Sequence, residues 1–223
     1  MAYTVSMRFI HGTPQEAATE IAKRLNALLA SKHSVLWLVS GGSNIAYQTM
    51  AMNMIPDQLS KNLTIIPVDE HFGRYNHANS NTASMRKAGF DAKHAEWIDI
   101  LERNIDINQT TRLYNDFLAR KIAAGDYIFA TLGMGKDGYT AGILPRSPAI
   151  TSSDFAVGYN ARDYPRITMC ADTLTAHCDE VILSAFGQNK LPALERLKNR
   201  DESRDILPAM ILHQIDNCTV YQD

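Results

Sequence analysis

Two carboxylates and an imidazole stand side by side directly after an apolar run. Asp69, Glu70 and His71 follow Leu63–Val68, whose composition is typical of a buried strand. Groups of these types accept and donate protons, and imidazole has an ordinary pKa of about 6.5. His71 is the only histidine next to the acidic pair. This stretch therefore predicts acid–base chemistry at the end of a strand.

A second set of polar side chains lies in a glycine-rich loop. The loop begins at Gly133 after the apolar run Tyr127–Leu132, and its glycines allow sharp turns and close approach to a ligand. Asp137 and Tyr139 add a carboxylate and a phenol. Because ligands of open α/β sheets bind just beyond the carboxyl ends of strands, we expect Asp137 and Tyr139 to face the same cleft as the first group.

The glycine spacing of this loop, G-x-G-x-x-G, is also the fingerprint of dinucleotide-binding proteins. That fingerprint requires a long helix after its third glycine, whereas Gly142 and Pro145 follow closely and would break such a helix. No acidic residue ends a second strand about 20 positions further on. We therefore expect no nucleotide cofactor.

A third stretch has the features of an anion-binding site. The apolar run Ser34–Val39 leads into Ser40-Gly41-Gly42-Ser43 and then into a helical pattern. Free backbone N–H groups and the positive end of a helix attract a phosphate. The alternative is a plain turn between a strand and a helix. We expect the backbone of Gly41 and Gly42 and the hydroxyl of Ser43 to bind a phosphate.

The composition restricts the class of protein. The 223 residues are 45% apolar and 21% charged, which suits one domain spanning residues 1–223. With a net charge of −2, we expect neither nucleic acid nor an anionic membrane as a partner. No apolar run has the length of a membrane span, and the first residues lack the pattern of a signal peptide. We expect a cytoplasmic protein that is a monomer or a homodimer.

The cysteines and histidines do not follow a metal-binding pattern. Cys170, Cys178 and Cys218 contain no C-x-x-C pair, which argues against a disulfide framework and against a zinc site. His71 and His77 lack the spacing of a metal-binding pair on a helix. We expect no metal, and we expect the cysteines to be reduced packing residues.

Strands and helices alternate along the chain. Thr13–Glu16 is a capping box that begins a helix, Ser80 or Asn81 can cap another, and Gly125 ends a third. The remaining expected elements are a helix at Thr110–Ala124, strands at Phe155–Tyr159, Ile167–Cys170, Glu180–Phe186 and Cys218–Tyr221, and a helix at Leu194–Lys198. This alternation predicts one doubly wound α/β domain with a mostly parallel, Rossmann-like sheet that binds no dinucleotide.

A series of short motifs resembles those of the 6-phosphogluconolactonases, which are related to glucosamine-6-phosphate deaminase. In order, the motifs are Ser40–Ser43, Asp69-Glu70, Ser80-Asn81, Leu132–Gly138, Pro165–Thr168, Gly187–Lys190 and Leu207–Ala209. The resemblance implies binding of a sugar phosphate, with Arg166 and Lys190 at the phosphate and Glu70 among the substrate-binding residues. It also implies hydrolysis of 6-phosphogluconolactone to 6-phosphogluconate, a step of the oxidative pentose phosphate pathway.

The chain departs from the family pattern at two positions. The family has Asp-Gly-His where this chain has Tyr139, and Asp-Glu-Arg where it has His71. A tyrosine with an ordinary pKa of about 10 is a poor base at neutral pH, but it donates a hydrogen bond to a carbonyl or ring oxygen. A histidine cannot replace the bidentate fork of an arginine. If catalysis persists, we expect His71 to supply the titrating group, with Asp69 or Asp137 as the alternative base.

Three functions stay open at this point: lactone hydrolysis, isomerisation or deamination of a sugar phosphate, and binding of a sugar phosphate without turnover. The motif Pro165–Thr168 favours the lactonase branch.

Overall fold

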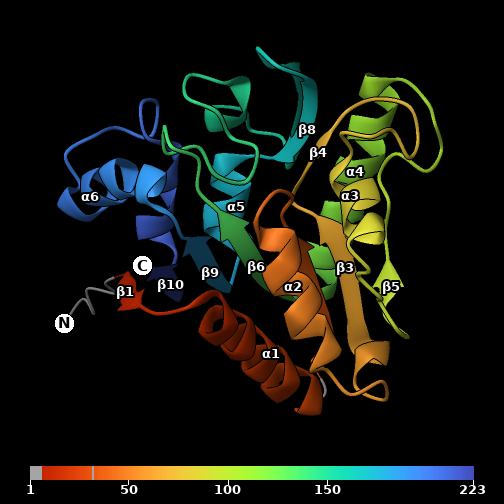
Figure 1. Ribbon diagram of the computed structural model, residues 1–223. Helices are drawn as coiled ribbons and strands as arrows, with labels where there is room; N and C mark the ends of the chain where they lie inside the picture. Colours follow the sequence, from red (N-terminus) through yellow and green to blue (C-terminus); the bar gives the residue numbers. More distant parts are fainter. Residues whose placement is uncertain (1–6, 32) are drawn as a thin grey trace.

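A seven-stranded parallel sheet forms the centre of the molecule (Figure 1). The computed structural model describes residues 7–31 and 33–223. Every neighbouring pair of strands in this sheet is parallel. Across the sheet, the strands are β1 (Arg8–His11), β10 (Cys218–Gln222), β9 (Glu180–Ala185), β6 (Tyr127–Gly133), β2 (Val35–Val39), β3 (Leu63–Pro67) and β5 (Glu96–Trp97).

Helices cover both faces of the sheet because side chains alternate between two cores along each strand. On β2, Val35 and Trp37 enter one core, while Leu36 and Leu38 enter the other. The first core includes side chains of α1 (Pro14–Ala30), α2 (Asn44–Asn53) and α3 (Asn81–Lys87). The second includes side chains of α4 (Ile107–Ala124), α5 (Ala171–His177) and α6 (Leu191–Asn199). Figure 1 shows α1 and α2 in front of the sheet.

The order of the strands reverses at the centre of the sheet. From β2 the chain moves outward to β3 and β5, and it then returns to β6 on the other side of β2 before continuing to β9 and β10. Ligands of such sheets bind where the order reverses, beyond the carboxyl ends of the strands. This position lies between the Ser40–Ser43 turn after β2 and the glycine-rich loop after β6.

A second, antiparallel sheet stands above the carboxyl edge of the first. It consists of β4 (Asp69–His71), β8 (Pro165–Met169) and β7 (Ala156–Asn160), in that order. The sequence pattern predicts β7 and β8 within one or two residues at each end. It does not predict that Asp69–His71 forms a strand paired with β8, because the partner lies about a hundred residues away in the chain.

Local signals account for several element ends. Thr13 and Glu16 form the expected capping box of α1, and Ser80 accepts a hydrogen bond from the N–H of Ala83 as the cap of α3. Gly125 ends α4 in the left-handed conformation, with φ 74°. The same helix begins earlier than expected, because the side chain of Asp106 caps it. The α/β class expected from the alternating pattern is confirmed.

The remaining elements are short 3-10 helices at Ser60–Asn62, Pro148–Ile150, Gln188–Lys190 and Pro208–Gln214. Within residues 7–31 and 33–223, no helix combines the length and the apolar character that crossing a membrane requires.

Candidate active site

A cavity of about 210 Å³ opens at the point where the strand order reverses. Its wall contains side chains or backbone from the turn after β2, from β4, from the loop after β6 and from β8. Eight residues expected from the sequence line it: Gly41, Gly42, Ser43, Asp69, His71, Tyr139, Arg166 and Lys190. Glu70 and Asp137 do not line it.

The turn after β2 is held in place from below by a buried amide. Gln48 accepts a hydrogen bond from the Ser40 N–H at 2.8 Å and donates one to the Ser40 carbonyl at 2.7 Å. Gly42 adopts φ 64°, a left-handed conformation that favours glycine. A Cβ atom on Gly41 would lie 1.9 Å from Oδ1 of Asn81. The turn therefore requires both glycines and presents backbone and the Ser43 side chain to the cavity.

The pairing of β4 with β8 decides which side chains face the cavity. Asp69 lies opposite Thr168 and His71 opposite Arg166 in the antiparallel register. Directly opposed residues, and residues two apart on one strand, share a face of the sheet. Asp69, His71 and Arg166 therefore point to one side, and Glu70 points to the other.

Glu70 is a structural residue, which corrects its expected role in substrate binding. Its side chain is fully buried and accepts hydrogen bonds from five donors at the beginning of α3 and in β4. The donors are the N–H groups of His71 (2.8 Å), Asn81 (2.6 Å) and Thr82 (3.0 Å) and the hydroxyls of Ser80 (3.0 Å) and Thr82 (3.0 Å). Burial raises the pKa of Glu70 to about 7. This carboxyl group holds α3 against β4.

Asp69 is the buried carboxylate of the cavity. Its Oδ2 lies 3.5 Å from Nη1 of Arg166, and the side-chain amide of Asn81 donates to its backbone carbonyl at 2.8 Å. Burial raises the pKa of Asp69, and the charges of Arg166 and His71 oppose that rise. A Cβ atom on Gly142 would lie 2.4 Å from Cβ of Asp69, so glycine is needed for this close approach.

The hydrogen bond of His71 selects the tautomer of its ring. Nδ1 lies 2.7 Å from the carbonyl oxygen of Asn79, and a carbonyl only accepts hydrogen bonds. In the neutral ring Nδ1 therefore carries the proton, and Nε2 keeps its lone pair. The ring also packs against Tyr164, with 5.1 Å between ring centroids. His71 is thus oriented with one nitrogen available as a base.

Tyr139 lines the cavity, but Asp137 does not. The Tyr139 ring packs over Gly135, where a Cβ atom would lie 2.1 Å from the ring. Burial raises the pKa of Tyr139 further above its ordinary value of 10.0, so the phenol stays protonated at neutral pH. Asp137 is exposed, and its carboxylate accepts from the Tyr139 N–H at 3.4 Å. The expectation that Asp137 faces the cleft is therefore wrong.

For two residues of the site, the sequence pattern indicates only local roles. Asn81 is a candidate helix cap in the sequence, and in the structure it connects the Gly41 turn to β4. Gly142 is a helix breaker in the sequence, and in the structure it makes room for Asp69. Both are contacts between segments far apart in the chain, and no local pattern signals them. Within the described residues, no group of three or more His, Cys, Asp or Glu side chains is placed to hold a metal ion.

Comparisons with known proteins match nearly the whole chain. A family model described as glucosamine-6-phosphate isomerases/6-phosphogluconolactonase matches residues 12–221. The chain is 28% identical to a 6-phosphogluconolactonase of Neisseria meningitidis over 93% of each chain. It is 26% identical to a glucosamine-6-phosphate deaminase of Staphylococcus aureus, over 95% of this chain and 91% of the relative. The crystal structure of a 6-phosphogluconolactonase from Thermotoga maritima has the same fold, with a TM-score of 0.81 at 16% identity, covering 97% of this chain and 99% of the other.

Proposed function

Because this chain belongs to the family of glucosamine-6-phosphate isomerases and 6-phosphogluconolactonases, we propose that it hydrolyses 6-phosphogluconolactone to 6-phosphogluconate. The observation that carries the proposal is the composition of one cavity. An imidazole, a buried carboxylate and a phenol line it together with the beginning of α2 and two cations. The lactonases among the relatives support the reaction type.

The phosphate of the substrate binds at the turn after β2. The N–H groups at the beginning of α2 and the positive end of its dipole favour an anion there. Lys190 and Arg166 line the same cavity and supply two charges. Each charge-assisted hydrogen bond to a phosphate is stronger than a neutral one. This end of the substrate fixes the position of the lactone ring.

The reaction opens the lactone by attack of water on its carbonyl carbon. His71 takes a proton from the water through Nε2 as the new C–O bond forms. The bond between the carbonyl carbon and the ring oxygen then breaks, and the ring oxygen leaves as a hydroxyl after taking a proton from the imidazolium. The protonated phenol of Tyr139 donates a hydrogen bond to an oxygen that gains negative charge. Asp69 stabilises the imidazolium electrostatically.

A turnover assay tests the proposal directly. Freshly prepared 6-phosphogluconolactone is added to the purified protein, and acid release is compared with the spontaneous rate in the same buffer. We expect release to rise in proportion to the protein concentration. Release at the spontaneous rate in every sample contradicts hydrolysis.

The deaminase relative supports a second candidate, isomerisation and deamination of glucosamine 6-phosphate. A buried carboxylate such as Asp69 is able to move a proton next to a carbonyl group. Ammonia release from glucosamine 6-phosphate, in parallel with the lactone assay, separates the two reactions. Binding of a sugar phosphate in calorimetry with neither product formed supports the third alternative, a non-catalytic binding protein.

A further inference from the structure

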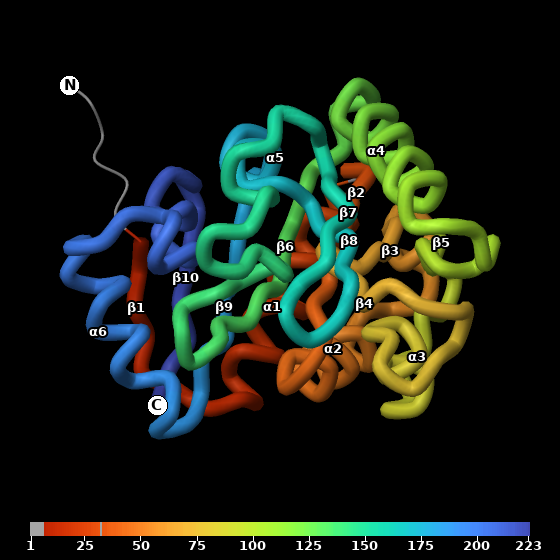
Figure 2. The backbone as a smooth tube through the Cα atoms, turned by 90° about the horizontal axis from the view of Figure 1, so that it is seen from above, coloured from red at the N-terminus to blue at the C-terminus, as the bar shows by residue number. Residues whose placement is uncertain are grey.

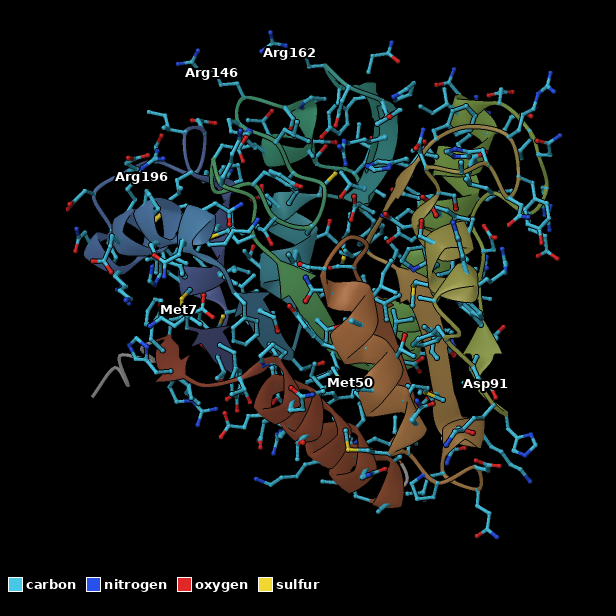
Figure 3. The ribbon with its side chains drawn as sticks, in the orientation of Figure 1. Met7, Met50, Asp91, Arg146, Arg162 and Arg196 are labelled. Carbon is cyan, nitrogen blue, oxygen red and sulfur yellow. The ribbon has the colours of Figure 1, made fainter. Side chains whose placement is uncertain are left out.

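The turn between β7 and β8 contacts two side chains of the cavity. Residues 161–164 form this turn, which the Ala161 N–H closes by donating to the Tyr164 carbonyl at 3.2 Å. Tyr164 packs on His71, and Asp163 pairs with Arg166. In Figure 2, which looks down on this edge of the sheet, the turn lies over the middle of the molecule. Figure 3 shows Arg162, from the same turn, at the outer end of the molecule.

Arg166 is held between two carboxylates. Its Nη2 lies 2.7 Å from Oδ2 of Asp163, and its Nη1 lies 3.5 Å from Oδ2 of Asp69. Its third nitrogen, Nε, is buried without a hydrogen-bond partner in the part of the chain that the structure describes. Only 6% of the residue is exposed. The single positive charge of Arg166 is therefore already balanced before any ligand arrives.

A phosphate that approaches Arg166 is a third anion beside one cation. One of the two carboxylates therefore has to be displaced from Arg166. Asp69 is buried in β4 and carries the close contact with Gly142. The side chain of Asp163 is 49% exposed and lies on the four-residue turn. Water can solvate the Asp163 carboxylate once it leaves Arg166, whereas Asp69 would stay buried. Asp163 is the carboxylate that exchanges.

We propose that Asp163 is an internal competitor of the substrate phosphate for Arg166 and thereby lowers the affinity of the cavity for anionic ligands. The inference rests on the proposed sugar-phosphate site. Every anion that binds Arg166 in place of Asp163 breaks the same ion pair, so the cost of the exchange does not depend on the ligand. A phosphate monoester carries close to two negative charges at pH 7, so its attraction to Arg166 offsets more of that cost than the attraction of a monoanion does.

The test uses two ligands that differ in charge but resemble each other in shape: glucose 6-phosphate and glucose 6-sulfate. Their dissociation constants are measured by calorimetry at pH 7.5 for the parent protein and for Asp163→Asn. We expect Asp163→Asn to bind both ligands about threefold to tenfold more tightly, within the range of a partly exposed ion pair. The gain should be similar for the two ligands, because each displaces the same carboxylate.

Asp91→Asn is the matched control, because it removes the same charge from an exposed position at the far end of the molecule (Figure 3). A gain for the dianionic phosphate that clearly exceeds the gain for the sulfate would indicate simple charge repulsion and would overturn the inference, as would affinities equal to those of the parent. Weaker binding by Asp163→Asn would also overturn it and would show that Asp163 positions Arg166 for the ligand. If the parent and both variants bind neither ligand, the proposed site itself is wrong.

Discussion

The side chains of this cavity that could transfer a proton differ in their protonation states. His71 donates through Nδ1 to a carbonyl, so its other nitrogen is a base. Tyr139 stays protonated, because burial raises its pKa, and it is therefore a donor. Asp69 lies near both side chains, and its negative charge stabilises an imidazolium electrostatically. In the proposed reaction, the roles of base and hydrogen-bond donor are therefore divided between His71 and Tyr139.

Substitutions of His71 and Tyr139 should have unequal effects. We expect His71→Ala to lower kcat by about 10²–10⁴-fold, the usual contribution of a positioned acid–base group. Tyr139→Phe removes one neutral hydrogen bond, and we expect a loss of about tenfold. Initial rates with fresh lactone measure both. A His71→Ala protein as active as the parent would point to Asp69 as the base, and a large gain of activity in Tyr139→His would show that this chain lacks a base that a histidine in the glycine-rich loop supplies.

Lys190 should contribute to the affinity for the phosphate end and little to the chemical step. We expect Lys190→Ala to weaken glucose 6-phosphate binding by about 1.5–3 kcal/mol, the range for a hydrogen bond to a charged group. Calorimetry measures this loss, and Lys87→Ala on the surface of α3 is the control. An unchanged dissociation constant in Lys190→Ala would place the phosphate elsewhere.

At the scale of elements, the short strand β4 separates two neighbouring acidic residues by function. Asp69 faces the cavity, whereas Glu70 faces the beginning of α3 and accepts from its N–H groups. The first N–H groups of a helix have no partners within the helix, so an acceptor at this position is stabilising. The three residues of β4 therefore contribute to the site and also anchor α3. The first residue of α3, Asn81, in turn supports the Ser40–Ser43 turn.

Replacing Glu70 should reduce stability. In Glu70→Gln an amide nitrogen has to face donors, and its best position leaves the Thr82 N–H without an acceptor. We expect a loss of about 1–3 kcal/mol in the free energy of unfolding. Urea denaturation at pH 5 measures it. Glu102→Gln, at an exposed position, should stay within about 0.5 kcal/mol of the parent.

The loss in Glu70→Gln should depend on pH. The pKa of Glu70 is raised from 4.5 to about 7 by burial, so the folded protein retains a proton that the unfolded chain releases. The stability gained from this group is complete below pH 4.5 and is lost as the pH rises to about 7. The difference between parent and Glu70→Gln should therefore shrink from pH 5 to pH 8. A difference that grows over this range would show that Glu70 is ionised in the folded protein.

For the whole molecule, the site exists only where the two halves of the sheet meet. The half of the sheet that contains β2 and β3 supplies the Ser40–Ser43 turn and leads into β4. The half that begins with β6 supplies the glycine-rich loop and leads into β8 and Lys190. An unfolded chain holds none of these together. Ligand binding should therefore stabilise the folded state as a whole.

Thermal unfolding with and without glucose 6-phosphate checks this linkage. At a ligand concentration of 100 times Kd we expect about 2.7 kcal/mol of added stability and a higher Tm. Lys190→Ala should show a smaller shift at the same concentration. Glucose without phosphate is the control ligand, and an equal shift with glucose would mean that the phosphate contributes nothing.

The sequence by itself determined the fold class, the strand ends and eight of the ten expected site residues lining the cavity. The fold class, the strand ends and six of these residues follow from local signals, namely apolar runs, glycines after strands and helix caps, whose physical causes lie within a few residues. Arg166 and Lys190 were expected from the resemblance of their motifs to those of the family. The sequence places Asp69 and Glu70 side by side directly after a strand, but it does not predict that they belong to a strand of their own. It does not say which of them faces the cavity.

Only the tertiary structure decided that question, because the pairing of β4 with β8 joins segments about a hundred residues apart. The same holds for Asp137, which a sharp turn directs to solvent, and for Arg166, whose two carboxylate partners come from β4 and from the turn before β8. Contacts of this kind depend on register and on the path of the chain in space. No local pattern in the sequence encodes them.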